Sequence, residues 1–243
     1  MKILKPFIVE LAPTLTGHWY KVWRAQEDGS KGEYLGVFVS STTILTAYPQ
    51  SEQLVKWIAD HGFHESREIR DSAGREGINI HKACDWLEEG KKLYSENYST
   101  KEWHKISTFV SWFKEYSPIL ITKEFSIFSE TGRYAGTLDR IYNISNEITL
   151  LDFKSSSSVH PHFPLQFSSY AHAIEENTDL EIVQTAALQL GSKNKDGYRF
   201  VIYPDWRDHY KVFEHVKGTW EYDNKIDSDF EPPVLELPET LQL

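Results

Sequence analysis

Two strand-like segments joined by a two-residue turn constrain the fold most. Residues 134–143 (YAGTLDRIYN) and 147–154 (EITLLDFK) both have the composition of short strands, with Ile, Thr, Tyr and Leu between polar breaks. Ser145-Asn146 separates them and suits a tight turn, because Asn tolerates positive φ. The sequence therefore predicts a β-hairpin over residues 134–154.

This hairpin would bring two carboxylates together. Counting outward from the turn, with Ile144 opposite Glu147, places Asp139 directly opposite Asp152. Directly opposed residues of an antiparallel pair have Cβ atoms about 4.5–5.5 Å apart, where two negative charges repel each other. Lys154 lies two residues beyond Asp152 and therefore projects from the same face. A sequence shaped by stability alone avoids such a pair, so we expect a binding site here.

A divalent cation between the two carboxylates would convert their repulsion into binding, and hard oxygen ligands suit Mg²⁺ or Mn²⁺. Lys154 would add positive charge beside the cation, where a phosphate carries negative charge in the transition state. These are the components of metal-assisted phosphodiester hydrolysis. The alternative is a surface hairpin with ordinary charges, because an isolated Asp-x-Lys sequence arises readily by chance.

Three short motifs follow one another in the chain: Gly136/Asp139 as G-x-x-D, Asp152/Lys154 as D-x-K, and Gln166/Tyr170 as Q-x-x-x-Y. In this order they resemble the RecB-like exonuclease branch of the PD-(D/E)xK nuclease superfamily, which includes relatives of the mitochondrial genome-maintenance exonuclease and phage proteins. The resemblance implies an α/β fold with a mixed central β-sheet flanked by helices, a restriction-endonuclease-like core. It also implies that Gln166 and Tyr170, one helical turn apart, face the active site and the DNA backbone.

The resemblance implies further metal ligands. Residues 77–81 (GINIH), in a helical stretch, resemble the family's G-x-x-x-H motif, in which the histidine, here His81, binds metal. Imidazole can join carboxylates around Mn²⁺, although a helical histidine with a purely structural role is the alternative. We also expect the main-chain carbonyl of Phe153 to reach the metal. Glu124, on a predicted strand at 119–128, is either a second-layer group behind the ligands or an exposed strand carboxylate.

A segment near the N-terminus is a candidate DNA contact. Ser40, Thr42 and Thr43 match a P-S-V-T-T-I-L-like segment of the same relatives, although two neighbouring positions depart from it, and Trp57 matches a tryptophan on the helix that follows. The hydroxyl groups are able to hydrogen-bond phosphate oxygens. A strand end followed by a helix cap is an equally open interpretation.

The composition favours one domain over the whole chain, because 243 residues with 40% hydrophobic content suffice for one sizeable core. The resemblance implies that this is a nuclease domain. We divide it into N-terminal strands (1–50), a helical part (51–118), the catalytic core (119–205) and an acidic C-terminal segment (206–243). No apolar run is long enough for a membrane span, and the opening segment does not resemble a secretory signal. The lone Cys84 fits a reducing cytoplasm, that of a bacterial host if the chain is phage-encoded, and excludes a four-cysteine iron–sulfur cluster.

The net charge of −10 argues against a simple nucleic-acid-binding protein, whose phosphate contacts come from Lys and Arg. Part of the acidity is local. Residues 221–240 (EYDNKIDSDFEPPVLELPET) form an acidic, proline-containing run that we expect to lie away from the site and to offer a contact for a partner protein. Metal-binding carboxylates also count as negative until a cation is bound.

Together these features predict a divalent-metal-dependent nuclease. The resemblance alone implies a deoxyribonuclease, a single-strand-preferring exonuclease of phage DNA replication or recombination. Asp139, Asp152, Lys154, Gln166 and Tyr170 would form its catalytic set. A structure-selective endonuclease is one alternative, and linear against closed-circular DNA would distinguish the two. A non-catalytic DNA-binding recombination protein is another, favoured by the acidity but disfavoured by the intact catalytic set.

Overall fold

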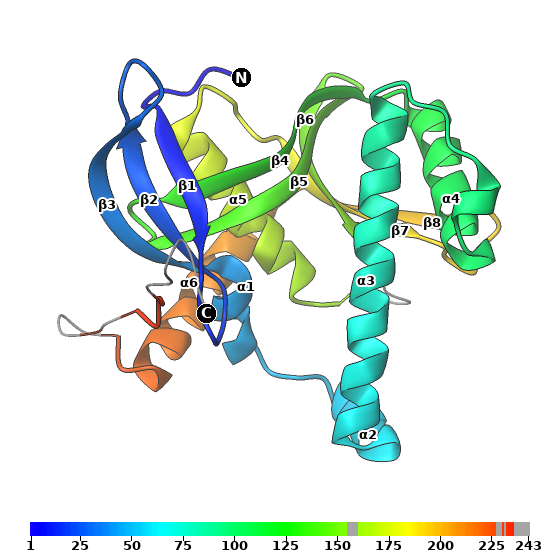
Figure 1. Ribbon diagram of the computed structural model, residues 1–243, viewed down its shortest axis with the longest axis horizontal. Helices are drawn as coiled ribbons and strands as arrows, with labels where there is room; N and C mark the ends of the chain where they lie inside the picture. The colour runs from blue at the N-terminus through cyan, green and yellow to red at the C-terminus, as the bar shows by residue number, and fades with distance from the viewer. Residues whose placement is uncertain (155–159, 227–229, 231, 236–243) are drawn as a thin grey trace, which may run out of the picture.

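The computed structural model describes residues 1–154, 160–226, 230 and 232–235, and shows an α/β fold (Figure 1). Eight strands in the described part form one mixed sheet, in the order β1-β2-β3-β5-β6-β7-β8, with β4 paired to β5. Helices cover both faces of the sheet. The predicted fold class is therefore confirmed.

The element bounds follow the predicted segments closely. The strands are β1 (Phe7–Ala12), β2 (Trp19–Ala25), β3 (Lys31–Ser40), β4 (Ile119–Ser129), β5 (Tyr134–Ile144), β6 (Glu147–Lys154), β7 (Gln184–Leu190) and β8 (Tyr198–Tyr203). The helices are α1 (Ser41–Ile44), α2 (Glu52–His61), α3 (Phe63–Glu88), α4 (Thr100–Tyr116), α5 (Phe163–Asn177) and α6 (Trp206–Asp223). None of these helices is long and apolar enough to cross a membrane.

The β5–β6 hairpin has the predicted turn. Ser145 and Asn146 adopt φ values of 53° and 69°, so both central residues are left-handed, as a type I′ turn requires. Ile144 pairs with Glu147, and the register continues as predicted to the pair of Arg140 and Leu151. The ladder ends there, one pair before Asp139 and Asp152. The predicted direct pairing of the two aspartates is therefore wrong.

The strands separate at this point because β5 changes its neighbour. Along one edge β4 accompanies β5 from Tyr134 to Asn143. Along the other edge β3 pairs in parallel with residues 134–135, and β6 pairs only from Arg140 onward. Residues 136–139 thus have no strand partner on this edge within the described sheet. We call this interval the β5 notch, and it contains both the glycine and the aspartate of the G-x-x-D motif.

Two hydrophobic cores lie on opposite faces of the sheet. One contains buried residues of α5 and α6, and the other contains buried residues of α3 and α4. Along β6, Leu150 belongs to the first core, whereas Leu151 and Phe153 belong to the second. Because side chains alternate along a strand, Asp152 faces the α5 side.

The predicted acidic C-terminal segment is only partly a tail, since its residues 206–223 form α6, which packs with α5.

A buried arginine fastens α3 to the sheet. The Arg140 side chain is fully buried; its Nη2 donates to Oδ1 of Asp85 at 2.5 Å and its Nε donates to Oε2 of Glu88 at 2.9 Å. Its Nη1 donates to the main-chain carbonyl of Asp139 at 2.8 Å. Tyr142, two residues along β5, also donates to Glu88. The carboxylates, Glu88 above all, raise the pKa of Arg140 although burial alone would lower it.

Arg140→Met should lower the free energy of unfolding by about 3–5 kcal/mol, because it leaves the Glu88 carboxylate, 3% exposed, without its charged partner. Chemical denaturation measures this change. Arg199→Met, on the exposed side of β8, is the matched control and should change stability by no more than about 0.5 kcal/mol. Equal losses of unfolding free energy in the two variants would show that Arg140 does not fasten α3 to the sheet.

Candidate metal centre and active site

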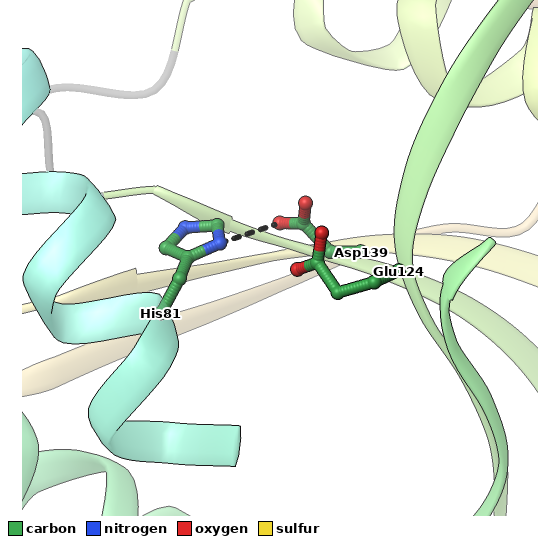
Figure 2. Close-up of side chains that lie close together, drawn as sticks. All are labelled: His81, Glu124 and Asp139. Carbon is green, nitrogen blue, oxygen red and sulfur yellow. Dashed lines mark ion pairs between the residues drawn. The ribbon is translucent and has the colours of Figure 1, made fainter. Parts of the chain in front are cut away.

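Three potential ligands meet beside the β5 notch. His81 of α3, Glu124 of β4 and Asp139 of β5 each offer one ligand atom, and these atoms lie within 4.8 Å of one another. Nδ1 of His81 is 3.6 Å from Oδ2 of Asp139. Figure 2 shows the two carboxylates pointing toward the imidazole ring. A nitrogen and carboxylate oxygens form a donor set that Mn²⁺ accepts readily and Mg²⁺ also tolerates.

Glu124 lies in this cluster because β4 has an unusual backbone at that residue. Lys123 pairs with Arg140 and Phe125 pairs with Leu138, so Glu124 lies opposite Asp139. Its φ of 47° is left-handed, a region that non-glycine residues rarely adopt and that is often associated with functional sites. Of the two interpretations of Glu124, the exposed strand carboxylate agrees with its side chain on β4, which is 50% exposed. Its carboxylate also stands among the potential ligands, and the second-layer role stays a prediction.

The pKa of Asp139 is strongly perturbed by its surroundings. Burial raises its pKa well above the ordinary value, and the charge of Asp152 raises it further, while Lys154 acts in the opposite direction. One of its oxygens, Oδ2, accepts a hydrogen bond from the main-chain N–H of Phe153 at 2.9 Å. This contact takes the place of the missing ladder pair and orients the carboxylate. A partly buried carboxylate with an acidic neighbour fits a cation, which would relieve the excess negative charge.

His81 is suited to be a ligand because its neutral form is favoured. Burial lowers the pKa of His81, and this outweighs the charges of Asp152 and Glu124, which raise it. The ring packs edge-on against Phe153 at 5.4 Å between centroids. A neutral imidazole held in this way keeps a nitrogen lone pair for a metal. The neutral ring is compatible with a metal ligand, and the ligand role of His81 stays a prediction.

Asp152 lies outside the three-residue cluster. It is buried, and its Oδ2 is 2.6 Å from Nζ of Lys154, so the predicted shared face of these two residues is confirmed. A carboxylate has two oxygens and about four lone-pair positions, so this ion pair leaves capacity for a cation. The ligand roles of Asp152 and of the Phe153 carbonyl stay predictions.

A chain of hydrogen bonds runs from Lys154 into α5. Nζ of Lys154 donates to Oε1 of Gln166 at 3.3 Å, and Nε2 of Gln166 donates to the hydroxyl of Tyr170 at 3.2 Å. The Tyr170 ring in turn rests on Gly136, where an added Cβ would lie 2.4 Å from Cε1 of the ring. The glycine of the first motif and the tyrosine of the third are therefore parts of one contact.

The prediction that Tyr170 contacts the DNA backbone is wrong for this structure. Its side chain is 3% exposed, and burial raises the pKa of its phenol above the ordinary value. Tyr170 instead orients Gln166, which orients Lys154. Gln166 is only half-buried, so its predicted contact with substrate stays a prediction.

The predicted N-terminal DNA contacts divide into two groups. Ser40 is buried and caps α1, since its Oγ accepts from the main-chain N–H of Thr43 at 3.0 Å; Oγ1 of Thr43 accepts from the N–H of His18 at 2.8 Å. The helix-cap interpretation is confirmed for Ser40, and Thr43 holds the main chain at His18. Thr42 is exposed, and Trp57 of α2 lies against His61, so their DNA-binding roles stay predictions.

A hollow of about 450 Å³ gives access to the cluster, and it is lined by one face of α3 together with Glu124 and Asp139. The sequence also predicts a contact for a partner protein at the acidic C-terminal segment. Residues 227–229, 231 and 236–243 of that segment lie outside the described residues, so this contact stays a prediction.

No model of a known protein family matches the chain, and a search of curated proteins finds no relative. The motifs and the geometry around the β5 notch are therefore the grounds on which a function can be proposed.

Asp139→Asn should raise the melting temperature in metal-free buffer, because it removes a partly buried charge near Asp152 while the amide oxygen still accepts from the N–H of Phe153. A gain of 1 kcal/mol corresponds to about 2–4 °C for a chain of this size. Folded Asp139 binds a proton more tightly than unfolded Asp139, so wild-type stability falls as the pH rises from the unfolded pKa through the raised folded pKa. The variant lacks this loss.

In saturating Mn²⁺ the wild type should have a higher melting temperature than Asp139→Asn. Metal binding stabilises the folded wild type by mass action, and the variant has lost a ligand. Calorimetry with and without Mn²⁺ measures both effects. Asp208→Asn, which changes an exposed carboxylate on α6, is the control and should keep the full metal-induced shift. An equal shift in Asp139→Asn would remove Asp139 from the metal site.

Proposed function

We propose that this protein is a divalent-metal-dependent deoxyribonuclease that hydrolyses phosphodiester bonds, acting as an exonuclease that prefers single-stranded DNA. The observation that carries the proposal is the convergence of His81, Glu124 and Asp139 within 4.8 Å, beside the buried pair of Asp152 and Lys154. Oε1 of Glu124 also lies 3.4 Å from Nη1 of Arg140, and its second oxygen leaves capacity for a cation. A metal-dependent phosphodiesterase needs these groups and a cation beside them.

His81, Glu124 and Asp139 would hold Mg²⁺ or Mn²⁺, with Asp152 as a further candidate. When bound, the metal supplies a Lewis acid for a phosphate oxygen and lowers the pKa of the attacking water. Two hydrogen bonds fix the position of Asp139: its carboxylate accepts from the N–H of Phe153, and its main-chain carbonyl accepts from Arg140. The ligands are thus oriented before metal or substrate arrives.

Lys154 would stabilise the negative charge that grows on the phosphate in the transition state. Its ammonium group is held between Asp152 and Gln166 and lies 4.5 Å from the ring centroid of Phe163. Aromatic surroundings exclude water, and charge interactions are stronger where water is excluded. Gln166 acts as a positioning residue, since its amide group links Lys154 to the buried Tyr170.

Digestion of end-labelled DNA tests the proposal. Linear single-stranded DNA should be degraded in Mg²⁺ or Mn²⁺ and left intact in EDTA, and double-stranded DNA should be degraded more slowly. Closed-circular single-stranded DNA should resist an exonuclease, whereas its cleavage would favour the endonuclease. Failure to cleave any of these DNA substrates in either metal would overturn the proposal and favour the non-catalytic DNA-binding protein.

Lys154→Ala should lower kcat by about 100- to 1,000-fold with little change in DNA affinity, because its charge is needed most in the transition state.

The double variant Gln166→Ala, Tyr170→Phe should lower kcat by at least roughly tenfold, since a displaced lysine is a misplaced catalytic group. Metal-induced stabilisation should persist in both. Gln53→Ala, an exposed glutamine on α2, is the control. If the double variant has the same kcat as the control, Gln166 and Tyr170 serve only the packing of α5.

A further inference from the structure

A second hollow, of about 630 Å³, lies beside the metal centre. It is bounded by α3, by residues 91–98 of the following loop and by the start of α4. The loop returns alongside α3, because Nδ2 of Asn79 on α3 donates to Oε1 of Glu102 on α4 at 2.9 Å. We call this space the α3–α4 hollow. Its volume lies in the range of about 300–1,000 Å³ that is typical of ligand sites.

The α3–α4 hollow combines aromatic rings with lysines. The residues of these two kinds are Trp86, Tyr94, Tyr98, Lys82, Lys91 and Lys92. Two lysines lie over the same indole, with Nζ of Lys82 at 5.1 Å and Nζ of Lys91 at 5.8 Å from the Trp86 ring. The Tyr94 side chain is 57% exposed, so one large ring is free to be covered by a ligand.

The local charge is positive although the chain as a whole is acidic. Lys91 is paired with Glu89 at 2.7 Å, whereas Lys82 and Lys92 form no ion pair with any residue that the structure describes. The acid in the lining, Glu102, is engaged by Asn79 and by the cap at Ser99, and these hydrogen bonds lower its pKa. Two unpaired ammonium groups beside exposed rings suit an anionic ligand that also has flat faces.

The α3–α4 hollow adjoins the proposed active site. Lys82 lines both this hollow and the smaller one that opens onto Glu124 and Asp139. His81, the residue before it, faces the metal cluster. A polyanion whose phosphate lies at the metal can therefore continue past Lys82 into the α3–α4 hollow.

We propose that the α3–α4 hollow is a subsite for unpaired nucleotides of a DNA strand next to the phosphate that is cleaved. Bases would stack on Tyr94 and Trp86, and phosphates would contact Lys82 and Lys92, the combination by which single strands are bound without sequence preference. Bases in a duplex have no free face to offer, so this subsite would select single-stranded ends. The inference rests on the proposed function and adds the source of its strand preference.

The test is the double variant Lys92→Glu, Tyr94→Ala, which changes two exposed side chains. Binding of a labelled oligodeoxythymidine of about 12 nucleotides is followed by fluorescence anisotropy in metal-free buffer. The Kd should rise at least roughly tenfold, from loss of one stacked base and one phosphate contact. The plot of log affinity against log salt should become shallower by about 0.7 for the lost lysine.

Lys211→Glu, Tyr222→Ala is the matched control, because it changes an exposed lysine and an exposed tyrosine on α6. This control should bind as wild type does. Equal affinities of the test and control variants would overturn the subsite, as would a wild type that does not bind the oligonucleotide. Polyglutamate that competes as well as unlabelled oligodeoxythymidine would also overturn it, because the hollow would then be a general anion site.

Digestion measured in parallel separates this inference from the proposed function. Wild type that binds through Lys92 and Tyr94 but never cleaves would retain the subsite and reject the nuclease. Wild type that cleaves, together with a test variant of unchanged affinity, would reject the subsite and retain the nuclease.

Discussion

The buried guanidinium group of Arg140 is the contact on which the candidate site depends. It joins Asp85 and Glu88 of α3 to the main chain of β5, and so sets the position of the helix that carries His81 against the strand that carries Asp139. Burying charges costs solvation energy, and a hydrophobic replacement of a whole buried ion network is often as stable. The network is better understood as a positional device, since it places a histidine and an aspartate from separate elements within reach of one cation.

The β5 notch supplies the second condition for the site. A continuous pair of strands would direct successive side chains to alternate faces, and would bury the polar groups of residues 136–139 in a ladder. Because β3 leaves β5 before β6 joins it, the sheet opens between its two halves. Asp139 uses the opening to accept from the N–H of Phe153, and Tyr170 fills the space above Gly136. Groups from the α3 side and from the α5 side thereby act at one place.

The sequence was sufficient to predict the fold class, the strand pair and its turn, since a turn residue such as Asn146 determines register through local backbone preference. The count failed at Asp139 because it assumed that both strands continue, whereas a side-chain contact with Phe153 ends the ladder. The position of Glu124 among the potential ligands could not be predicted, because it depends on a left-handed backbone that no local motif announces. Tyr170 was expected at the substrate because helical spacing gives a face, but does not reveal what covers it.

Whether His81, Glu124 and Asp139 hold a divalent cation can be seen by anomalous scattering from a crystal grown with Mn²⁺. We expect a manganese peak within about 2.0–2.6 Å of a side-chain ligand atom from each of the three residues. Crystals of Asp139→Asn grown in the same way should lack or weaken that peak. Manganese bound elsewhere in the wild type, with none between these three side chains, would show that they are not the metal site.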